Sequence, residues 1–180
     1  MSDRQGTARL FIAFDGGPSK QPAEWHWAFV LTDGGYPSMH TPSLVYQIQN
    51  EDGGRDSWKA KHGACILGDL GAFQGVVELP ACNDTTVADV QNVLEGAPVL
   101  PQNIPALVRE QWNCALWIID ILMEYGPIWG MDLDGTGAES NDYRKLGVYI
   151  LGRSFRLREE QEGTPEIQVT ADGLRIVSFQ

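Results

Sequence analysis

An apolar run that ends at a Gly-Pro pair decides the fold: residues 113–127 are NCALWIIDILMEYGP. Its apolar residues recur every three or four positions, among them Leu116, Ile119, Leu122 and Met123. This spacing is typical of a helix, and the further apolar residues on either side of the stripe indicate burial over much of the helix circumference. Proline cannot continue a helix, so the Gly-Pro pair ends it. The pattern predicts a buried central helix over residues 114–125.

Strand patterns lie on both sides of this helix. Short runs of β-branched, aromatic and aliphatic residues, most of them bounded by turn residues, predict strands at 10–14, 26–31, 43–48, 75–79, 147–151, 167–170 and 174–179. A shorter helix is predicted over 87–94, and residues 84–86 (Asp-Thr-Thr) offer its N-cap. These elements predict one α+β domain, residues 1–180, in which an antiparallel sheet packs on one buried central helix.

The charge and length of the chain exclude several classes of partner. Among its 180 residues, 13 Lys and Arg stand against 24 Asp and Glu, a formal charge of −11. This charge opposes binding to nucleic acid or to anionic lipid. No apolar run reaches the roughly 18 residues that a spanning helix needs, and the first residues lack an apolar signal core. We expect a soluble, cytoplasmic protein with a small-molecule substrate or ligand and no stable membrane insertion.

The cysteines favour free thiols rather than a structural role. Cys65, Cys82 and Cys114 are an odd set without a C-x-x-C pair, which is typical of reduced cytosolic thiols and not of disulfides or zinc sites. A calcium loop beginning at Asp132 would need Glu at its twelfth position, where Tyr143 stands. The sequence therefore predicts neither a metal nor a cofactor.

Two separate motifs carry the candidate chemistry. Residues 24–31 are EWHWAFVL, with His40 beyond the next turn, and residues 111–117 are QWNCALW. A cysteine in the first turn of a helix ionises readily, because free backbone N–H groups and the helix dipole stabilise its thiolate. A histidine at the start of a strand can accept the thiol proton, and a second polar side chain fixes its tautomer. Cys114, His26 and His40 are the predicted nucleophile, base and orienting residue.

The start of the central helix decides between two interpretations of Cys114. If Asn113 caps a helix that begins at Cys114, the thiol lies among free N–H groups. If the helix begins at Pro105, which is favourable at the first helical position, Cys114 lies in mid-helix and is an inert core residue. His40 is equally compatible with a loop residue of no function.

Four of the six tryptophans flank the two motifs. Trp27 and Trp117 are expected to fill the core between sheet and helix. Trp25 and Trp112 are expected to line a pocket for an apolar ligand, and with Asn113 they are the predicted substrate-binding residues. The remaining candidates have structural interpretations. His62 is expected to be exposed, and Cys65 and Cys82 to serve in packing.

The order of these motifs resembles a known family. An H-W-A strand, a second histidine about a dozen residues on, and a later Asn-Cys at a buried helix are similar to the circularly permuted NlpC/P60 thiol enzymes. The closest similarity in motif order is to the lecithin:retinol acyltransferase and H-rev107-like group. The resemblance implies a permuted papain-like fold, with His26 as base, His40 orienting it and Cys114 as nucleophile. Ala-Leu-Trp replaces the Glu-His-Phe that follows the cysteine in that group. A set of small uncharacterised fungal proteins shares the same split, a resemblance that implies no activity.

Three functions remain open at this point. The leading hypothesis is a cysteine-dependent hydrolase or acyl/amide transferase that acts on a small, largely uncharged substrate. The alternative is a noncatalytic domain that binds a ligand or a protein in a Trp-lined cleft of the same scaffold. A third possibility is a cyclase or isomerase that uses His26 as an acid and base without a covalent step. The sequence leaves the substrate and the oligomeric state open.

Overall fold

The computed structural model describes residues 7–17, 19–54, 57–83, 85–136, 142–158 and 167–179. A seven-stranded sheet dominates these residues, and its strands are β1 (Ala8–Asp15), β2 (His26–Asp33), β3 (Ser43–Tyr46), β6 (Gly63–Cys65), β7 (Phe73–Glu78), β8 (Ile167–Val169) and β9 (Arg175–Ser178). The strand order is β6-β3-β2-β1-β7-β9-β8. Neighbouring strands are antiparallel, apart from the parallel pair β7 and β9. The predicted α+β class and mainly antiparallel sheet are confirmed.

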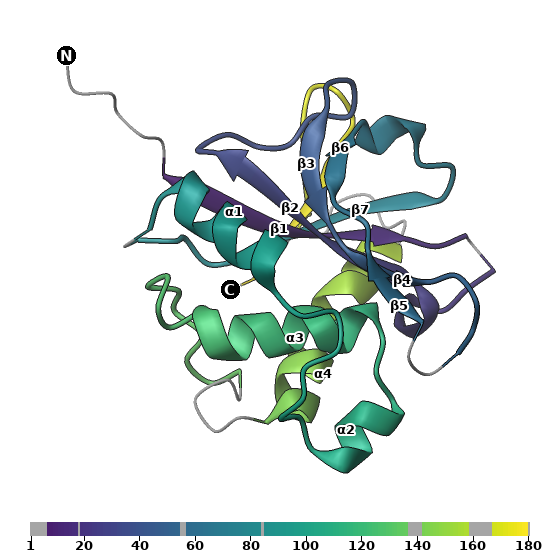
Figure 1. Cartoon of the computed structure of the whole chain (residues 1–180). Helices are drawn as coiled ribbons and strands as arrows, with labels where there is room; N and C mark the ends of the chain where they lie inside the picture. The colour runs from purple at the N-terminus through teal and green to yellow at the C-terminus, as the bar shows by residue number, and fades with distance from the viewer. Residues whose placement is uncertain are drawn as a thin grey trace.

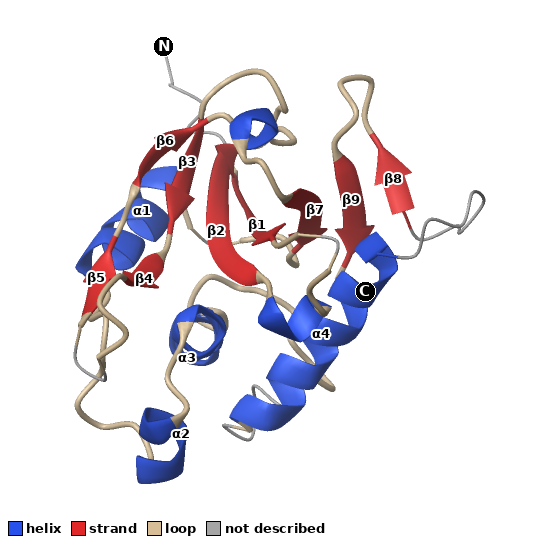
Figure 2. Ribbon diagram, turned by 90° about the vertical axis from the view of Figure 1, so that its right-hand side faces the viewer, coloured by secondary structure: helices blue, strands red, loops and turns tan. Residues whose placement is uncertain are grey.

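The helices cover one face of this sheet (Figures 1 and 2). They are α1 (Val87–Gly96), α2 (Ala106–Glu110), α3 (Cys114–Tyr125) and α4 (Tyr143–Arg158). The central helix α3 packs against β2, while α4 packs against β7 and β9. The predicted bounds of the central helix are confirmed, and it ends at Gly126. No helix among the described residues is both long and apolar enough to cross a membrane.

Alternation along β1 and β2 divides the core into two clusters, one on each face of the sheet. Leu10, Ile12 and Phe14 lie with the helices in the larger cluster. Phe11 and Ala13 belong to a smaller cluster on the opposite face. The antiparallel register runs without a slip along the whole of β1 and β2. Because side chains alternate in direction, this register fixes which residues of the two strands share a face.

The N-cap of α1 confirms the predicted helix start. Thr86 Oγ1 accepts a hydrogen bond from the Asp89 backbone N–H, and the Asp89 carboxylate accepts one from Thr86 N, which is a capping box. Asp84 lies outside the described residues. Val90 and Leu94 of α1 are fully buried, because they lie one turn apart on the face that packs on the sheet.

The predicted strand at 147–151 is wrong, because this segment lies inside α4. Leu146, Ile150 and Leu157 are fully buried, at spacings of four and seven residues. Such spacing is typical of a helix. The apolar run at 147–151, considered alone, is also compatible with a strand. The two glycines of α4, Gly147 and Gly152, lower its helix propensity, and packing on the sheet overrides that preference.

The predicted strand at 43–48 is in fact two strands that separate at Gln47. β3 stays in the main sheet, while β4 (Ile48–Asn50) pairs with β5 (Trp58–Ala60) in a small second sheet. β5 lies within residues 50–61, a polar and charged stretch of the sequence. The break leaves the side chain of Gln47 at the end of β3, near the start of β2.

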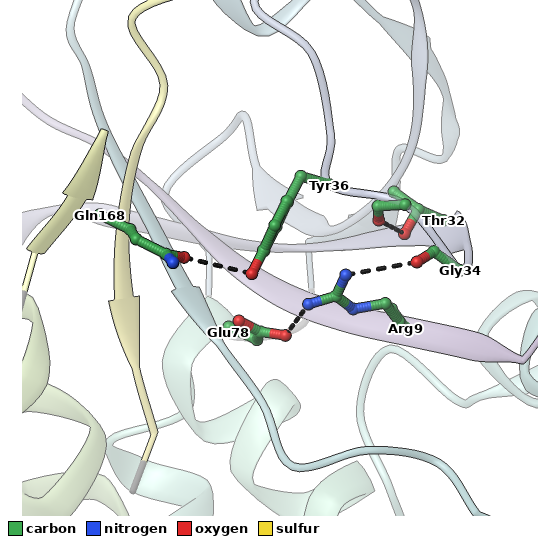
Figure 3. Close-up of polar contacts among 7 residues, drawn as sticks. Arg9, Thr32, Gly34, Tyr36, Glu78 and Gln168 are labelled. Atoms are coloured by element: carbon green, nitrogen blue, oxygen red, sulfur yellow. Dashed lines mark hydrogen bonds and ion pairs between the residues drawn. The ribbon is translucent and has the colours of Figure 1, made fainter. Parts of the chain in front are cut away.

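The face opposite the helices is covered by loops and by a short 3-10 helix, η2 (Leu67–Asp69). A network of polar side chains also lies on this face of the sheet, around Arg9 of β1 (Figure 3). Arg9 forms an ion pair with Glu78, and its guanidinium lies 4.2 Å from the Tyr36 ring centroid. Tyr36 Oη donates to Gln168 Oε1 at 3.1 Å. The network therefore joins β1, β7 and β8 through the loop that follows β2.

Candidate active site

Cys114 is the first residue of α3, as one of the two interpretations requires. The side chain of Asn113 accepts a hydrogen bond from the Leu116 backbone N–H at 2.9 Å and caps the helix. The preceding helix α2 ends at Glu110, so the alternative of one helix from Pro105 onward is wrong. The thiol therefore lies at the end of a 12-residue helix where backbone N–H groups are free and the dipole is positive.

His26 meets this thiol at the start of β2. The side chains of His26 and Cys114 lie close enough to act on each other's pKa. The next backbone N–H of the strand, that of Trp27, donates a hydrogen bond to Cys114 Sγ at 3.4 Å. The N–H of Ala115 also acts to lower the pKa of the thiol. These donors stabilise a negative charge on the sulfur.

The two groups shift each other's pKa in the directions that favour an ion pair. Burial acts to raise the pKa of the Cys114 thiol, but the hydrogen bond and charge of His26 and the backbone donors outweigh it, so the pKa is lowered. Burial acts to lower the pKa of His26, but Cys114, Gln47 and the charge of Asp15 outweigh it, so the pKa is raised. A lowered thiol pKa beside a raised imidazole pKa favours thiolate with imidazolium.

Gln47 holds the other side of the His26 ring. Its Oε1 lies 2.5 Å from His26 Nε2 and also accepts a hydrogen bond from Gln49 Nε2 at 3.4 Å. An amide oxygen accepts only, so Nε2 of His26 carries the proton. Nδ1 is then the ring nitrogen left to face the thiol. The thiol of Cys114, the imidazole of His26 and the amide of Gln47 therefore lie in series.

His62 supports Gln47 from behind. Its Nδ1 accepts a hydrogen bond from the Gln47 backbone N–H at 3.2 Å. Its ring stacks on Trp117 with centroids 6.0 Å apart and planes 22° apart. Burial lowers the pKa of His62, against an opposing effect of Glu95. The expectation of an exposed His62 is wrong: the side chain is half-buried and links α3 to the loop that carries Gln47.

The orienting position predicted for His40 belongs to Gln47. His40 is exposed in the loop between β2 and β3, where its backbone N–H donates to Ser38 Oγ at 3.0 Å. The loop itself is held by Asp172, which accepts from Met39 N at 2.8 Å. The resemblance assigned the orienting role to His40 because of its spacing from His26. Spacing along the chain does not determine which side chain contacts the imidazole of His26.

The predicted substrate-binding residues have structural roles instead. Trp25 and Trp112 are only 4% and 6% exposed and belong to the main core cluster, as do Trp27 and Trp117. Trp112 Nε1 donates to the Val99 carbonyl oxygen at 2.8 Å. The side chain of Asn113 is engaged in the helix cap. The expectation for Trp27 and Trp117 is confirmed, while that of a cleft lined by Trp25 and Trp112 is wrong.

The other two thiols lack the surroundings of Cys114. Cys82 is fully buried, and burial raises its pKa to about 11. Cys65 is half-buried, and burial together with the charges of Asp69 and Asp15 raises its pKa. Across the described parts of the chain, no three His, Cys, Asp or Glu side chains are arranged to hold a metal ion.

Gln47 and Asp15 lie at the site but were not predicted from the sequence. Gln47 is the one polar side chain in an otherwise apolar strand pattern from Leu44 to Ile48, and that irregularity was the available signal. Asp15 is the last residue of β1 and pairs with His26 in the antiparallel register. The long connection between β1 and β2 hides this register from the sequence.

Comparisons with protein-family models, with curated proteins and with solved structures found no match to this chain.

Proposed function

We propose that this protein is a cysteine-dependent hydrolase or acyl/amide transferase. Cys114 is the nucleophile, His26 the general base and acid, and Gln47 the group that orients His26. The observation that carries the proposal is the contact between the Cys114 thiol, at the start of α3, and the His26 ring. A thiol placed among helix N-terminal donors and paired with an imidazole is the arrangement that activates a cysteine nucleophile.

The reaction follows from the placement of these groups. The Cys114 sulfur attacks a substrate carbonyl carbon, and the proton of the thiol passes to His26. The carbonyl oxygen becomes an oxyanion, which the Cys114 backbone N–H and a neighbouring donor stabilise. The bond to the leaving group then breaks, and the imidazolium gives its proton to that group. Water or a second nucleophile attacks the thioester and releases the acyl group and the thiol.

The same arrangement supports a permuted papain-like scaffold as part of the proposal. His26 is carried by a strand and precedes, in chain order, the cysteine at the start of the helix that packs on that strand. This is the order of the permuted NlpC/P60 enzymes that the sequence resembles. Gln47 takes the place that a second histidine holds in the lecithin:retinol acyltransferase-like group, so the proposal carries over the scaffold and the thiol chemistry but not the lipid substrate.

The noncatalytic alternative receives no support from the tryptophans. It needed a cleft lined by Trp25 and Trp112, and both side chains are buried in the core. Catalysis remains the function that the geometry favours.

Trapping an acyl-enzyme tests the proposal. The protein is incubated with an activated ester such as p-nitrophenyl acetate, and the adduct is located by mass spectrometry of peptides. We expect a burst of p-nitrophenol and an acetyl group on Cys114, with both lost in Cys114→Ser and strongly reduced in His26→Ala. Cys65→Ala is the matched control and keeps both. Acetylation that is equally fast on Cys65 or unchanged in His26→Ala contradicts the proposal.

A further inference from the structure

A small pocket of about 90 Å³ lies beside His26, the proposed base, on the sheet face opposite the helices. It shares His26 and Gln47 with the site, and Ala13, Ala28 and Val45 supply part of its apolar wall. Its volume suits a group of a few non-hydrogen atoms. A pocket with mostly apolar walls and a few convergent polar groups is the usual form of a small-molecule subsite.

Asp15 supplies the carboxylate in the lining of this pocket. It ends β1 and lies directly opposite His26 in the antiparallel register, at a bulge between β1 and β7. Asp15 Oδ1 is buried and has no hydrogen-bond partner among the described residues. Leaving a buried acceptor unpaired destabilises a fold, and more so when the acceptor is charged. Asp15 Oδ1 can therefore accept a hydrogen bond from a donor group of a bound ligand.

No lysine or arginine competes for Asp15 among the described residues that line the pocket. Among the nearby basic residues, Lys59 and Lys61 form ion pairs with Glu51, and Arg9 forms one with Glu78. Lys20 is exposed in the connection between β1 and β2. Asp69 adds negative charge, since it and Asp15 both act on the pKa of Cys65 in the pocket wall. The His26 ring contacts Gln47 and donates no hydrogen bond to Asp15 Oδ1, although the charge of Asp15 acts on it. In the ion pair, the negative charge of the Cys114 thiolate offsets the positive charge of this ring. The local field therefore favours a positively charged group.

Building on the proposed function, we propose that Asp15 binds a cationic N–H donor of the substrate, such as a primary ammonium group, and positions the adjoining carbonyl at Cys114. A charge-assisted hydrogen bond to Asp15 Oδ1 would satisfy the unpaired oxygen. The substrate class then narrows from the largely uncharged molecule expected from the sequence to a small amine-bearing ester, amide or thioester. Asp15 is the residue that distinguishes it from a neutral or anionic analogue.

Charged thiol reagents test this inference without a known substrate. In a Cys65→Ala background, Cys114 is modified with 2-aminoethyl or with 2-sulfonatoethyl methanethiosulfonate, reagents of similar length and opposite charge. In each case the thiolate forms a mixed disulfide and methanesulfinate leaves. We expect Asp15→Asn to lower the ratio of the cationic to the anionic rate about tenfold, the size of a unit charge at close range. Asp15→Glu keeps most of the ratio.

The matched control is Asp33→Asn, which changes the net charge equally at the exposed far end of β2. It leaves the ratio nearly unchanged. Equal ratios in the Asp15→Asn and Asp33→Asn variants overturn the inference and leave Asp15 a residue that holds an ordered water only. Methanethiosulfonates also modify ordinary thiols, so the ratio of the two rates can be measured even if Cys114 is not activated. Activation of Cys114, on which the proposed function depends, is measured separately by the rate with neutral iodoacetamide.

Stability provides a second, independent measurement. If Asp15 serves ligand binding and destabilises the free protein, its replacement does not lower stability. We therefore expect Asp15→Asn and Asp15→Ser to unfold at the same urea concentration as the parent protein or at a higher one. Strong destabilisation in both variants assigns Asp15 a structural role and contradicts the inference.

Discussion

Gln47 Oε1 lies 2.5 Å from His26 Nε2, across the point where β3 ends and β4 leaves the main sheet. Gln47 lines the same face of the sheet as Val45 two residues before it, and His26 lies on that face as well. Its carboxamide oxygen therefore meets Nε2 of the imidazole and leaves Nδ1 as the ring nitrogen available to the thiol.

Removing the side-chain amide of Gln47 tests whether Gln47 or His40 orients the His26 ring. Gln47→Ala frees the ring to rotate, and misplacement of a catalytic group by about 1 Å costs roughly a hundredfold in rate. We expect iodoacetamide to modify Cys114 about 10 to 100 times more slowly in Gln47→Ala, and at the parent rate in His40→Ala. A loss in His40→Ala with none in Gln47→Ala would restore the assignment made from the sequence.

The helix cap should affect stability and thiol reactivity together. Asn113→Ala removes the acceptor for the Leu116 N–H, and loss of an N-cap costs about 1 kcal/mol of the free energy of unfolding. The first turn of α3 then frays, so Cys114 loses part of its N–H environment. Asn113→Ser keeps an acceptor and should restore both properties. Urea unfolding and the iodoacetamide rate check this, and a stable Asn113→Ala variant with unchanged reactivity contradicts it.

His62 should make the fold sensitive to mild acid. Its pKa is lowered in the folded protein, mainly by burial, from an ordinary value of 6.5. The unfolded chain therefore binds this proton more readily, and the contribution of His62 to stability is present above pH 6.5 and is lost as the pH falls through the lowered pKa. His26 acts in the opposite sense, because its folded pKa is raised.

A variant isolates the His62 contribution. His62→Phe keeps a ring on Trp117 but does not titrate. We expect the difference in free energy of unfolding between the parent protein and His62→Phe to fall as the pH is lowered from about 7 toward about 5. A difference that stays constant or grows over that range shows that His62 is not buried as a neutral acceptor for Gln47.

Trp112 should matter for stability and not for reactivity. Trp112→Phe removes the part-buried hydrogen bond to the Val99 carbonyl oxygen, and loss of such a bond costs about 0.5 to 1.5 kcal/mol of the free energy of unfolding. Because Trp112 packs in the core rather than lining a cleft, the rate at which iodoacetamide modifies Cys114 should stay within about twofold of the parent rate. A stable variant with altered reactivity would return Trp112 to the binding site.

The extent of sequence-based prediction depends on the range of the interactions involved. The start of α3 at Cys114 could be predicted because the cap and the apolar period are local. The pairing of Cys114 with His26 rested on motif order, and the contact agrees with it. Gln47 and Asp15 could not be placed, because their positions depend on which strands pair with β2 and on the register across the long connection between β1 and β2. The apolar run at 147–151 predicts a strand when it is considered without the helical spacing of the buried residues around it.

The pH dependence of Cys114 alkylation tests the pairing of Cys114 with His26 most directly. The rate with iodoacetamide is measured from about pH 5 to about pH 10 in the Cys65→Ala background, with and without His26→Ala. The ion pair with His26 predicts a midpoint below the ordinary thiol value of 9.0, and a shift of that midpoint upward toward or beyond 9.0 in His26→Ala. A midpoint near 9.0 that is the same in both proteins would contradict an activated thiol at this site.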